Sequence, residues 1–278
     1  MEPTRLHSLL RSHLPSPKPS DDKYSRGVVG AVVGSETYPG AALLVVSAIR
    51  ACSVGMVRYF GPQRVADLVL QAHPEVVAAE SVSESTRVDS WVLGSGVAAT
   101  ADSQLQNLAL AVSLGQPCVI DAEALDHLDF LALRHVPLIL TPHAAELTRL
   151  VMRWLPDRPE LLATSNDLIR AEAARELATV LGQTILAKGN VTFVADSDGR
   201  FDAVGPNDPN LATAGTGDVL AGLLAGLAAH SFADWFEIAV LGVNLHSQLA
   251  REASAQGPVV ASALPAHLPA AVLALGNG

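Results

Sequence analysis

Residues 209–227 read PNLATAGTGDVLAGLLAGL, and the rest of the chain is organised around them. The first half is a run of small residues with two glycines, Gly215 and Gly217, so its backbone amides are left bare. In the second half, large apolar residues recur at helical spacing with small residues between them. This pattern predicts a closely packed helix that begins near Thr216. The N-terminus of such a helix attracts anions through its free N–H groups and its dipole.

One carboxylate, Asp218, falls in the first turn of this predicted helix. An acid at a helix start often does no more than interact with the dipole, and glycines there often only form a turn. Here, however, a glycine-rich run stands directly before the carboxylate, at the mouth of an apolar helix. That context favours an anion hole with a general base beside it.

Composition limits the class of protein. The chain has 278 residues, 49% of them hydrophobic, which suits one large α/β domain. Its formal net charge of −10 argues against nucleic acid or an anionic membrane as the main partner. The two cysteines, Cys52 and Cys118, lie in apolar segments without metal-ligand spacing and are expected to be reduced. With neither a membrane-length apolar stretch nor a signal peptide in the sequence, we expect a cytoplasmic protein.

Strands and helices are predicted to alternate. Residues 1–24 are expected to form a lead-in arm with a helix over 4–14, and residues 25–278 a single domain. Strands are predicted over 27–34, 54–60, 76–79, 88–93, 117–120 and 136–140, and helices over 41–52, 65–72, 101–114 and 122–134. Thr141 and Pro142 are predicted to start a helix that continues to residue 151. A helix over 166–181, strands over 184–188 and 191–196, and helices over 217–229 and 234–251 complete the pattern. This order predicts a parallel sheet with helices on both faces.

Ligands of open α/β sheets gather at the carboxyl ends of the strands, so the polar residues there are the candidates for a site. Segment 94–99, GSGVAA, nominally fits a dinucleotide fingerprint, but at least two predicted strands precede it, and the fingerprint normally opens the first unit. The sequence contains no Gly-Lys-Ser or Gly-Lys-Thr, which excludes a Walker A loop. Any nucleotide would therefore bind to another scaffold.

Three further side chains follow predicted strands, and each has a structural alternative. His143 near a helix start is either a site residue or a structural histidine. Lys188, before the hairpin-type turn Gly189-Asn190, is either a solvated lysine or a phosphate ligand. Asp121 is either a plain N-cap or a direct participant in the site.

The run Gly215-Thr216-Gly217-Asp218 resembles the anion-hole motif of ribokinase-like enzymes, and the whole chain resembles their NAD(P)H-hydrate dehydratase branch. The matching segments keep the family's order: 23–34, 38–41, 93–96, 119–125, 140–150, 188–192 and 210–222. The resemblance implies a ribokinase-like three-layer α/β/α fold with a central, mostly parallel sheet. It also implies repair of hydrated NADH and NADPH (the S forms of NADHX and NADPHX), with ADP in most bacterial forms or ATP in eukaryotic ones.

The resemblance also implies roles for particular residues. It implies that the catalytic residues are Asp218, Gly215 and Gly217, and that the hydrated dinucleotide binds to Ala41, Gly96, His143 and Asp218. It also implies that the adenine nucleotide binds to Lys188, Gly189, Asn190, Val191, Thr192 and Gly217. The implied chemistry is phosphoryl transfer to the ring hydroxyl, followed by loss of phosphate, with Mg²⁺ bridging the nucleotide phosphates and few protein ligands. A homotetramer and a separate epimerase partner are implied as well.

The chain departs from the family pattern at a few small residues. Ser95 stands where proline is usual, Ala98 and Ala214 replace glycines, and Ala144-Ala145 replaces a proline-glycine pair. Two alternative functions share the same motif: a small-molecule kinase acting on a vitamin precursor or sugar alcohol, and a non-catalytic nucleotide-binding protein. Because a binding module needs no base, Asp218 beside its glycines argues against the second alternative.

Overall fold

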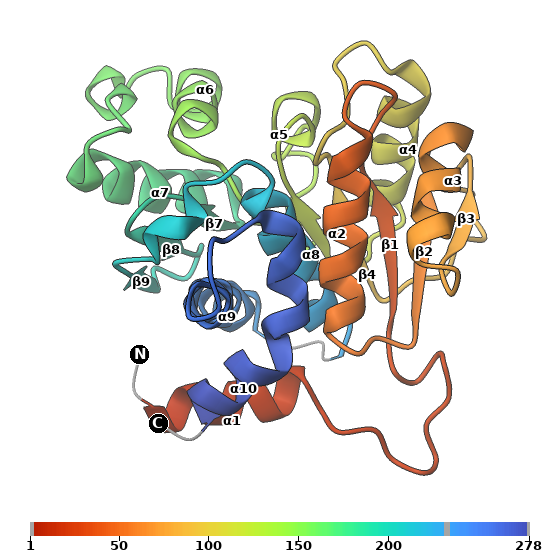
Figure 1. Cartoon of the computed structure of the whole chain (residues 1–278). Helices are drawn as coiled ribbons and strands as arrows, with labels where there is room; N and C mark the ends of the chain where they lie inside the picture. The colour runs from red at the N-terminus through yellow and green to blue at the C-terminus, as the bar shows by residue number, and fades with distance from the viewer. Residues whose placement is uncertain (1–2, 231–233, 277–278) are drawn as a thin grey trace.

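The computed structural model describes residues 3–230 and 234–276 (Figure 1). Its strands are β1 Val28–Val32, β2 Met56–Phe60, β3 Val77–Ala79, β4 Ser90–Leu93, β5 Cys118–Ile120, β6 Leu138–Leu140, β7 Thr184–Ala187, β8 Thr192–Ala195 and β9 Phe201–Val204. They form one sheet in the order β3-β2-β1-β4-β5-β6-β7-β8-β9. Strands β1 to β7 pair in parallel, whereas β8 and β9 run antiparallel to their neighbours. The predicted mostly parallel sheet is confirmed.

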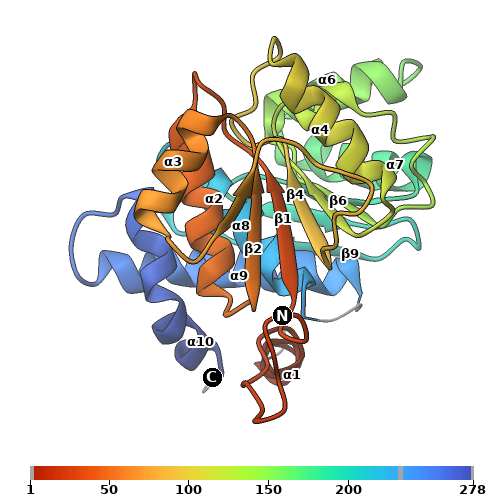
Figure 2. The same cartoon turned by 90° about the vertical axis from the view of Figure 1, so that its right-hand side faces the viewer.

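Helices cover both faces of the sheet, as Figure 2 shows in a view turned by 90°. One face packs against α2 Pro39–Ala51, α3 Gln63–Ala72, α8 Thr216–Ala228 and α9 Trp235–Ser254. The other face packs against α4 Asp102–Ser113, α5 Ala124–His127, α6 Ala144–Trp154 and α7 Asp167–Leu181. Side chains of β1 alternate between these layers: Val29 and Ala31 point to the first face, Val28 and Val32 to the second. The predicted three-layer α/β/α fold is confirmed.

Helix α8 lies against α2, and small residues allow this close approach. A side chain at Gly222 would overlap the backbone carbonyl of Val45, and one at Gly226 would overlap Cys52. Leu223, Leu224 and their apolar neighbours fill the remaining space and are fully buried. The small residues of the 209–227 stretch thus bring α8 close to α2, and the predicted close packing of this helix is confirmed.

The predicted helix over 122–134 is wrong in length, because α5 spans only Ala124–His127. Ala122 before it adopts a left-handed backbone with φ 49°, and Leu128 after it is extended. The Asp129 carboxylate then accepts hydrogen bonds from the backbone N–H groups of Leu131 and Ala132. This local side-chain turn competes with continuation of the helix.

The two ends of the described chain lie side by side (Figure 1). Helix α1 Pro3–His13 confirms the predicted helix of the arm, and it packs against α9 and α10 Leu268–Gly276. Three short 3₁₀ segments, η1 Pro159–Leu162, η2 Pro209–Leu211 and η3 Ala261–His267, complete the fold. Strand β9 and helix α10 were not predicted from the sequence. The division into an arm and one domain stays a prediction, and its outermost residues 1–2 and 277–278 lie outside the described part.

No helix within residues 3–230 and 234–276 is both long enough and apolar enough to cross a membrane.

Candidate active site

A buried carboxylate, Asp121, lies at the centre of the carboxyl edge of the sheet. It follows β5, and its Oδ1 accepts hydrogen bonds from Lys188 Nζ (2.7 Å) and Thr141 Oγ1 (2.8 Å), which follow β7 and β6. Its Oδ2 accepts a hydrogen bond from Ser95 Oγ (2.8 Å), which follows β4. The alternative that Asp121 is a plain N-cap is wrong, because its side chain joins three neighbouring strand ends instead of capping α5.

Asp121 and Lys188 form a buried ion pair. Burial by itself would raise the pKa of Asp121, but the ammonium of Lys188 and the three hydrogen bonds outweigh it and hold the pKa below its ordinary value. Burial likewise opposes the charge of Lys188, yet Asp121 and Glu146 raise the pKa of that lysine. The floor of the site therefore carries a fixed ammonium, which faces the carboxyl groups of Asp121, Glu146 and Asp218.

Asp218 lies in the first turn of α8, where burial and charge change its acidity. Burial, supported by the nearby Asp121 carboxylate, raises the pKa of Asp218 to about 6, although Lys188 acts in the opposite direction. No side chain in the described ranges donates a hydrogen bond to the Asp218 carboxylate. A carboxylate with this pKa can accept a proton near neutral pH, as a general base must.

The glycine turn before Asp218 connects two halves of the site. Gly215 is the N-cap of α8 with a left-handed backbone (φ 90°), and a side chain there would come 2.5 Å from Leu44 of α2. A side chain at Gly217 would come 3.7 Å from Lys188 Nζ, so the first turn of α8 approaches the ammonium. The N–H of Thr216 donates to the carbonyl of Thr213 (3.3 Å), so the unpaired amides of this described turn are those of Gly217 and Asp218.

The start of α6 differs from the prediction. His143 is the N-cap instead of Thr141: its Nδ1 accepts hydrogen bonds from the N–H groups of Ala145 (3.1 Å) and Glu146 (3.4 Å). Glu146 Oε2 in turn accepts the N–H of His143 (2.8 Å), which completes a capping box. The Thr141 hydroxyl donates to Asp121, and Thr141 lies two residues before the N-cap because α6 begins only at Ala144. Burial raises the pKa of Glu146, and its carboxyl group also interacts with the charge of Lys188. The sequence analysis assigned no role to Glu146, although its position three residues after His143 is the spacing of a capping box.

A cavity of about 450 Å³ opens beside Lys188, between β7, β8 and the first turn of α8. Five of the six residues predicted to bind nucleotide line this cavity: Lys188, Gly189, Asn190, Thr192 and Gly217. Val191 does not line it, and its carbonyl accepts a hydrogen bond from Arg170 instead. His143, predicted to bind the dinucleotide, lines the same cavity as Lys188.

Ala41, in the first turn of α2, and Gly96, after β4, form a second group. Gly96 has a left-handed backbone (φ 67°), and a side chain there would overlap Ala41 and come 3.1 Å from the carbonyl oxygen of Tyr38. Neither residue lines the cavity beside Lys188. The residues predicted to bind the dinucleotide therefore do not form one cluster. Ala41 lies with Gly96, His143 lies at the start of α6, and Asp218 lies in the turn of α8 between α2 and Lys188.

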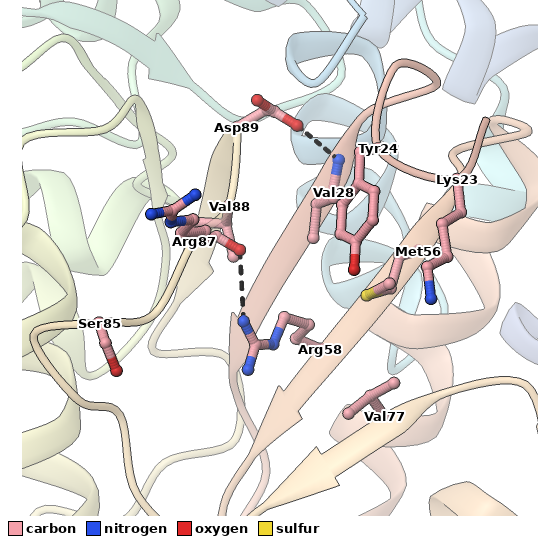
Figure 3. A pocket seen from close by; sticks show the side chains of 10 residues that line it. All are labelled: Lys23, Tyr24, Val28, Met56, Arg58, Val77, Ser85, Arg87, Val88 and Asp89. Carbon is pink, nitrogen blue, oxygen red and sulfur yellow. Dashed lines mark hydrogen bonds between the residues drawn. The ribbon is translucent and has the colours of Figure 1, made fainter. Parts of the chain in front are cut away.

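A larger cavity, of about 670 Å³, lies at the opposite, amino ends of the strands (Figure 3). Three cations, Lys23, Arg58 and Arg87, and the exposed ring of Tyr24 line it. Asp89 Oδ2 there accepts the backbone N–H of Val28 (2.7 Å). Since every predicted site residue lies elsewhere, the candidate active site is at the carboxyl edge of the sheet.

Comparison with known proteins gives the family. The family model of NAD(P)H-hydrate dehydratase matches residues 29–272. The bifunctional NAD(P)H-hydrate repair enzyme Nnr of Mycobacterium tuberculosis is 41% identical over 219 residues, which cover 77% of this chain and 43% of that protein. The ADP-dependent (S)-NAD(P)H-hydrate dehydratase of Neisseria meningitidis is 31% identical over 265 residues, which cover 90% of this chain and 85% of that one. The chain thus spans about half the length of the bifunctional relatives that it matches.

Solved structures support the fold. The ADP/ATP-dependent NAD(P)H-hydrate dehydratase of Bacillus subtilis, co-crystallised with ATP and Mg²⁺, superposes with a TM-score of 0.78 at 24% identity and covers 97% of both chains. A ribokinase-like superfamily protein of Enterococcus faecalis gives 0.78 at 21% identity, covering 100% of this chain and 96% of the other. At such identities these structures establish the ribokinase-like fold alone. Because the family model spans residues 29–272, the chain belongs to the NAD(P)H-hydrate dehydratase family.

Proposed function

We propose that the protein dehydrates the S forms of hydrated NADH and NADPH, converting ADP to AMP, or ATP to ADP, and phosphate. The observation that carries the proposal is Asp218: a carboxylate with a pKa near 6, in the glycine turn of α8, beside the Lys188 ammonium. The names of the relatives from M. tuberculosis and N. meningitidis support the same chemistry. A hydroxide is a poor leaving group and a phosphate a good one, which explains why a dehydration is coupled to a nucleotide.

The residues suggest an order of events. The nucleotide phosphates bind beside Lys188, and the hydrated ring binds near Ala41 and Gly96 at the other side of the α8 turn. Asp218 takes the proton of the ring hydroxyl as the hydroxyl oxygen attacks the terminal phosphorus, and the bond from that phosphorus to the departing AMP or ADP breaks. The amides of Gly215 and Gly217 stabilise charge on the transferring group. Phosphate then leaves the ring carbon with the electrons of the C–O bond, the neighbouring ring carbon releases a proton to solvent, and the double bond is restored.

Magnesium, which the resemblance implies, fits the donors that are present. Asp121 and Glu146 are buried carboxylates near Lys188, and Asp218 lies close by. Residues 3–230 and 234–276 hold no group of three or more metal-ligating side chains. This donor set suits a Mg²⁺ ion that is held mainly by phosphate oxygens and by one or two carboxylates. Bound there, the ion would neutralise phosphate charge.

Incubation with hydrated NADH, Mg²⁺ and either ADP or ATP tests the proposed function. We expect the absorbance of reduced nicotinamide to return, with release of phosphate and one AMP or ADP for each dinucleotide repaired. A small-molecule kinase would consume nucleotide only with its own alcohol and leave a phosphorylated product. If neither nucleotide restores the absorbance, the lyase proposal is wrong.

The proposal extends to the state of the protein in the cell. We expect a homotetramer in the cytoplasm that works together with an epimerase activity, as the family resemblance implies. Sedimentation velocity at micromolar concentration tests the assembly, and a monomer there would contradict it.

A further inference from the structure

Two polar atoms of residues lining the cavity beside Lys188 have no hydrogen-bond partner. They are Nε2 of His246, on α9, and Oδ1 of Asn207, in the loop after β9, and both atoms are buried. Within the described residues neither atom is paired. Buried polar atoms in proteins are nearly always paired, because an unpaired one loses its hydration without compensation. Two such atoms in the residues of one cavity point to a ligand that completes their bonding.

The amide of Asn207 is oriented by the nucleotide-facing loop. Its Nδ2 donates to the carbonyl of Gly189 (2.9 Å) and to Thr192 Oγ1 (3.0 Å), and its backbone N–H donates to the carbonyl of Asn190 (2.7 Å). These bonds use the donor side of the amide, which leaves Oδ1 as an acceptor. The turn after Lys188 therefore fixes an unmatched, buried acceptor on a residue that lines the cavity.

The imidazole of His246 lies at the backbone of Thr216, at the start of α8, with 6% of the residue exposed. Burial lowers its pKa to about 4, and the Lys188 charge acts in the same direction, although a hydrogen bond to the backbone of Thr216 opposes this. The ring is therefore neutral near pH 7, with one nitrogen that donates and one that accepts. A neutral ring has little electrostatic attraction for phosphate, whereas the ammonium of Lys188 attracts it strongly.

The cavity thus has two chemically different parts. Lys188 and the amide of Gly217 suit an anion, whereas His246 and Asn207 are uncharged and stand among apolar residues, Pro209, Leu211 and Leu220. We propose that Asn207 and His246 bind the nucleoside part of the adenine nucleotide through its uncharged N–H and O–H groups. This inference rests on the proposed function for the identity of the ligand. The ribose hydroxyls and the base amino group share this chemistry.

Calorimetric titration of ADP into His246→Leu and Asn207→Ala tests the inference. One hydrogen bond to an uncharged group corresponds to a rise in Kd of about 2- to 12-fold for each variant. Inorganic pyrophosphate, which lacks a nucleoside, should bind within about 2-fold of wild type. Asn210→Ala, an amide in the same loop but outside the cavity, is the matched control and should bind ADP as wild type does.

The melting temperature of His246→Leu distinguishes a ligand-binding role of the imidazole from a purely structural one. Replacing an unpaired buried imidazole with leucine should leave the melting temperature of the free protein unchanged or raise it, while ADP binding weakens. A large loss of stability in His246→Leu, with unchanged ADP affinity, would mean that the ring only supports α8, and the inference would be overturned. Equal weakening of ADP and pyrophosphate binding would also overturn it, because the residues would then act on phosphate.

Nucleotide analogues separate the two sources of the donor group. If a ribose hydroxyl is bound, 2′-deoxy-ADP or 3′-deoxy-ADP should bind wild type more weakly, and His246→Leu should add no further loss. If the base amine is bound, inosine diphosphate should behave in this way instead. Wild type that restores NADH while both variants bind ADP normally would refute this inference alone. Nucleoside-dependent binding without restoration of NADH would refute only the proposed function.

Discussion

Asp218→Asn is expected to reduce turnover at least ~100-fold while nucleotide affinity stays within about a few-fold of wild type. The amide keeps the size of the carboxylate but cannot accept the proton of the ring hydroxyl, and the nucleotide phosphates are assigned to Lys188 and Gly217 instead. Single-turnover kinetics with hydrated NADH, together with titration of ADP, separate the two quantities. Asp157→Asn, an exposed carboxylate in the loop after α6, is the control for loss of one negative charge.

Asp218 should also determine how activity and folding stability depend on pH. Activity of wild type should fall as pH drops through about 6, because burial raises the pKa of Asp218 from 3.8 to about 6 and protonation removes the base. The folded protein holds this proton more tightly than the unfolded chain does, so ionisation of Asp218 lowers stability as pH rises from 4 to 6. Asp218→Asn should therefore be more stable than wild type near pH 7, by up to about 3 kcal/mol. The gain should disappear as the pH falls towards 4.

Two results would contradict the assignment of Asp218. Equal losses of nucleotide binding and turnover would indicate a structural carboxylate at the helix start. A variant that is less stable than wild type at pH 7 would show that the Asp218 charge stabilises the fold, against the direction of its pKa. Denaturant titrations of both proteins at pH 4 and pH 7 provide the second comparison.

Lys188→Ala is expected to raise the nucleotide dissociation constant by about 10- to 150-fold, since a charge-assisted contact to phosphate contributes roughly 1.5 to 3 kcal/mol. Binding of the hydrated dinucleotide should change little, because its ring is assigned to Ala41 and Gly96. The ion pair with Asp121 adds a second expectation. Loss of the lysine leaves a buried carboxylate unpaired, which should lower the free energy of unfolding by about 3 to 5 kcal/mol.

A double variant separates the two effects of Lys188. Lys188→Met combined with Asp121→Asn removes both charges, so most of the stability should return while nucleotide affinity stays low. Arg58→Ala removes a cation from the cavity at the opposite end of the sheet and should leave the affinity for both ligands unchanged (Figure 3). A larger loss for the dinucleotide than for ADP or ATP in Lys188→Ala would show that the two subsites are reversed.

The sequence by itself determined the elements whose signals are local. Apolar periodicity and short turns predicted most strands and helices, and the small residues of 209–227 predicted the close packing of α8 that Gly222 makes possible. It also indicated which strand ends carry polar residues. Since parallel strands bring their carboxyl ends to one edge of the sheet, it located the candidate site at that edge. These properties depend on neighbours within a few positions along the chain.

Only the tertiary structure decided how those residues are used. Asp121 and Lys188 are 67 positions apart, and their ion pair arises because β5, β6 and β7 are adjacent in the sheet. The Thr141 hydroxyl also donates to Asp121, and α6 begins only at Ala144, so that His143 is its N-cap. The raised pKa of Asp218 and the unpaired Nε2 of His246 likewise depend on burial by segments distant in sequence. Burial and long-range charge are sums over all packed neighbours, and local sequence pattern carries no information about them.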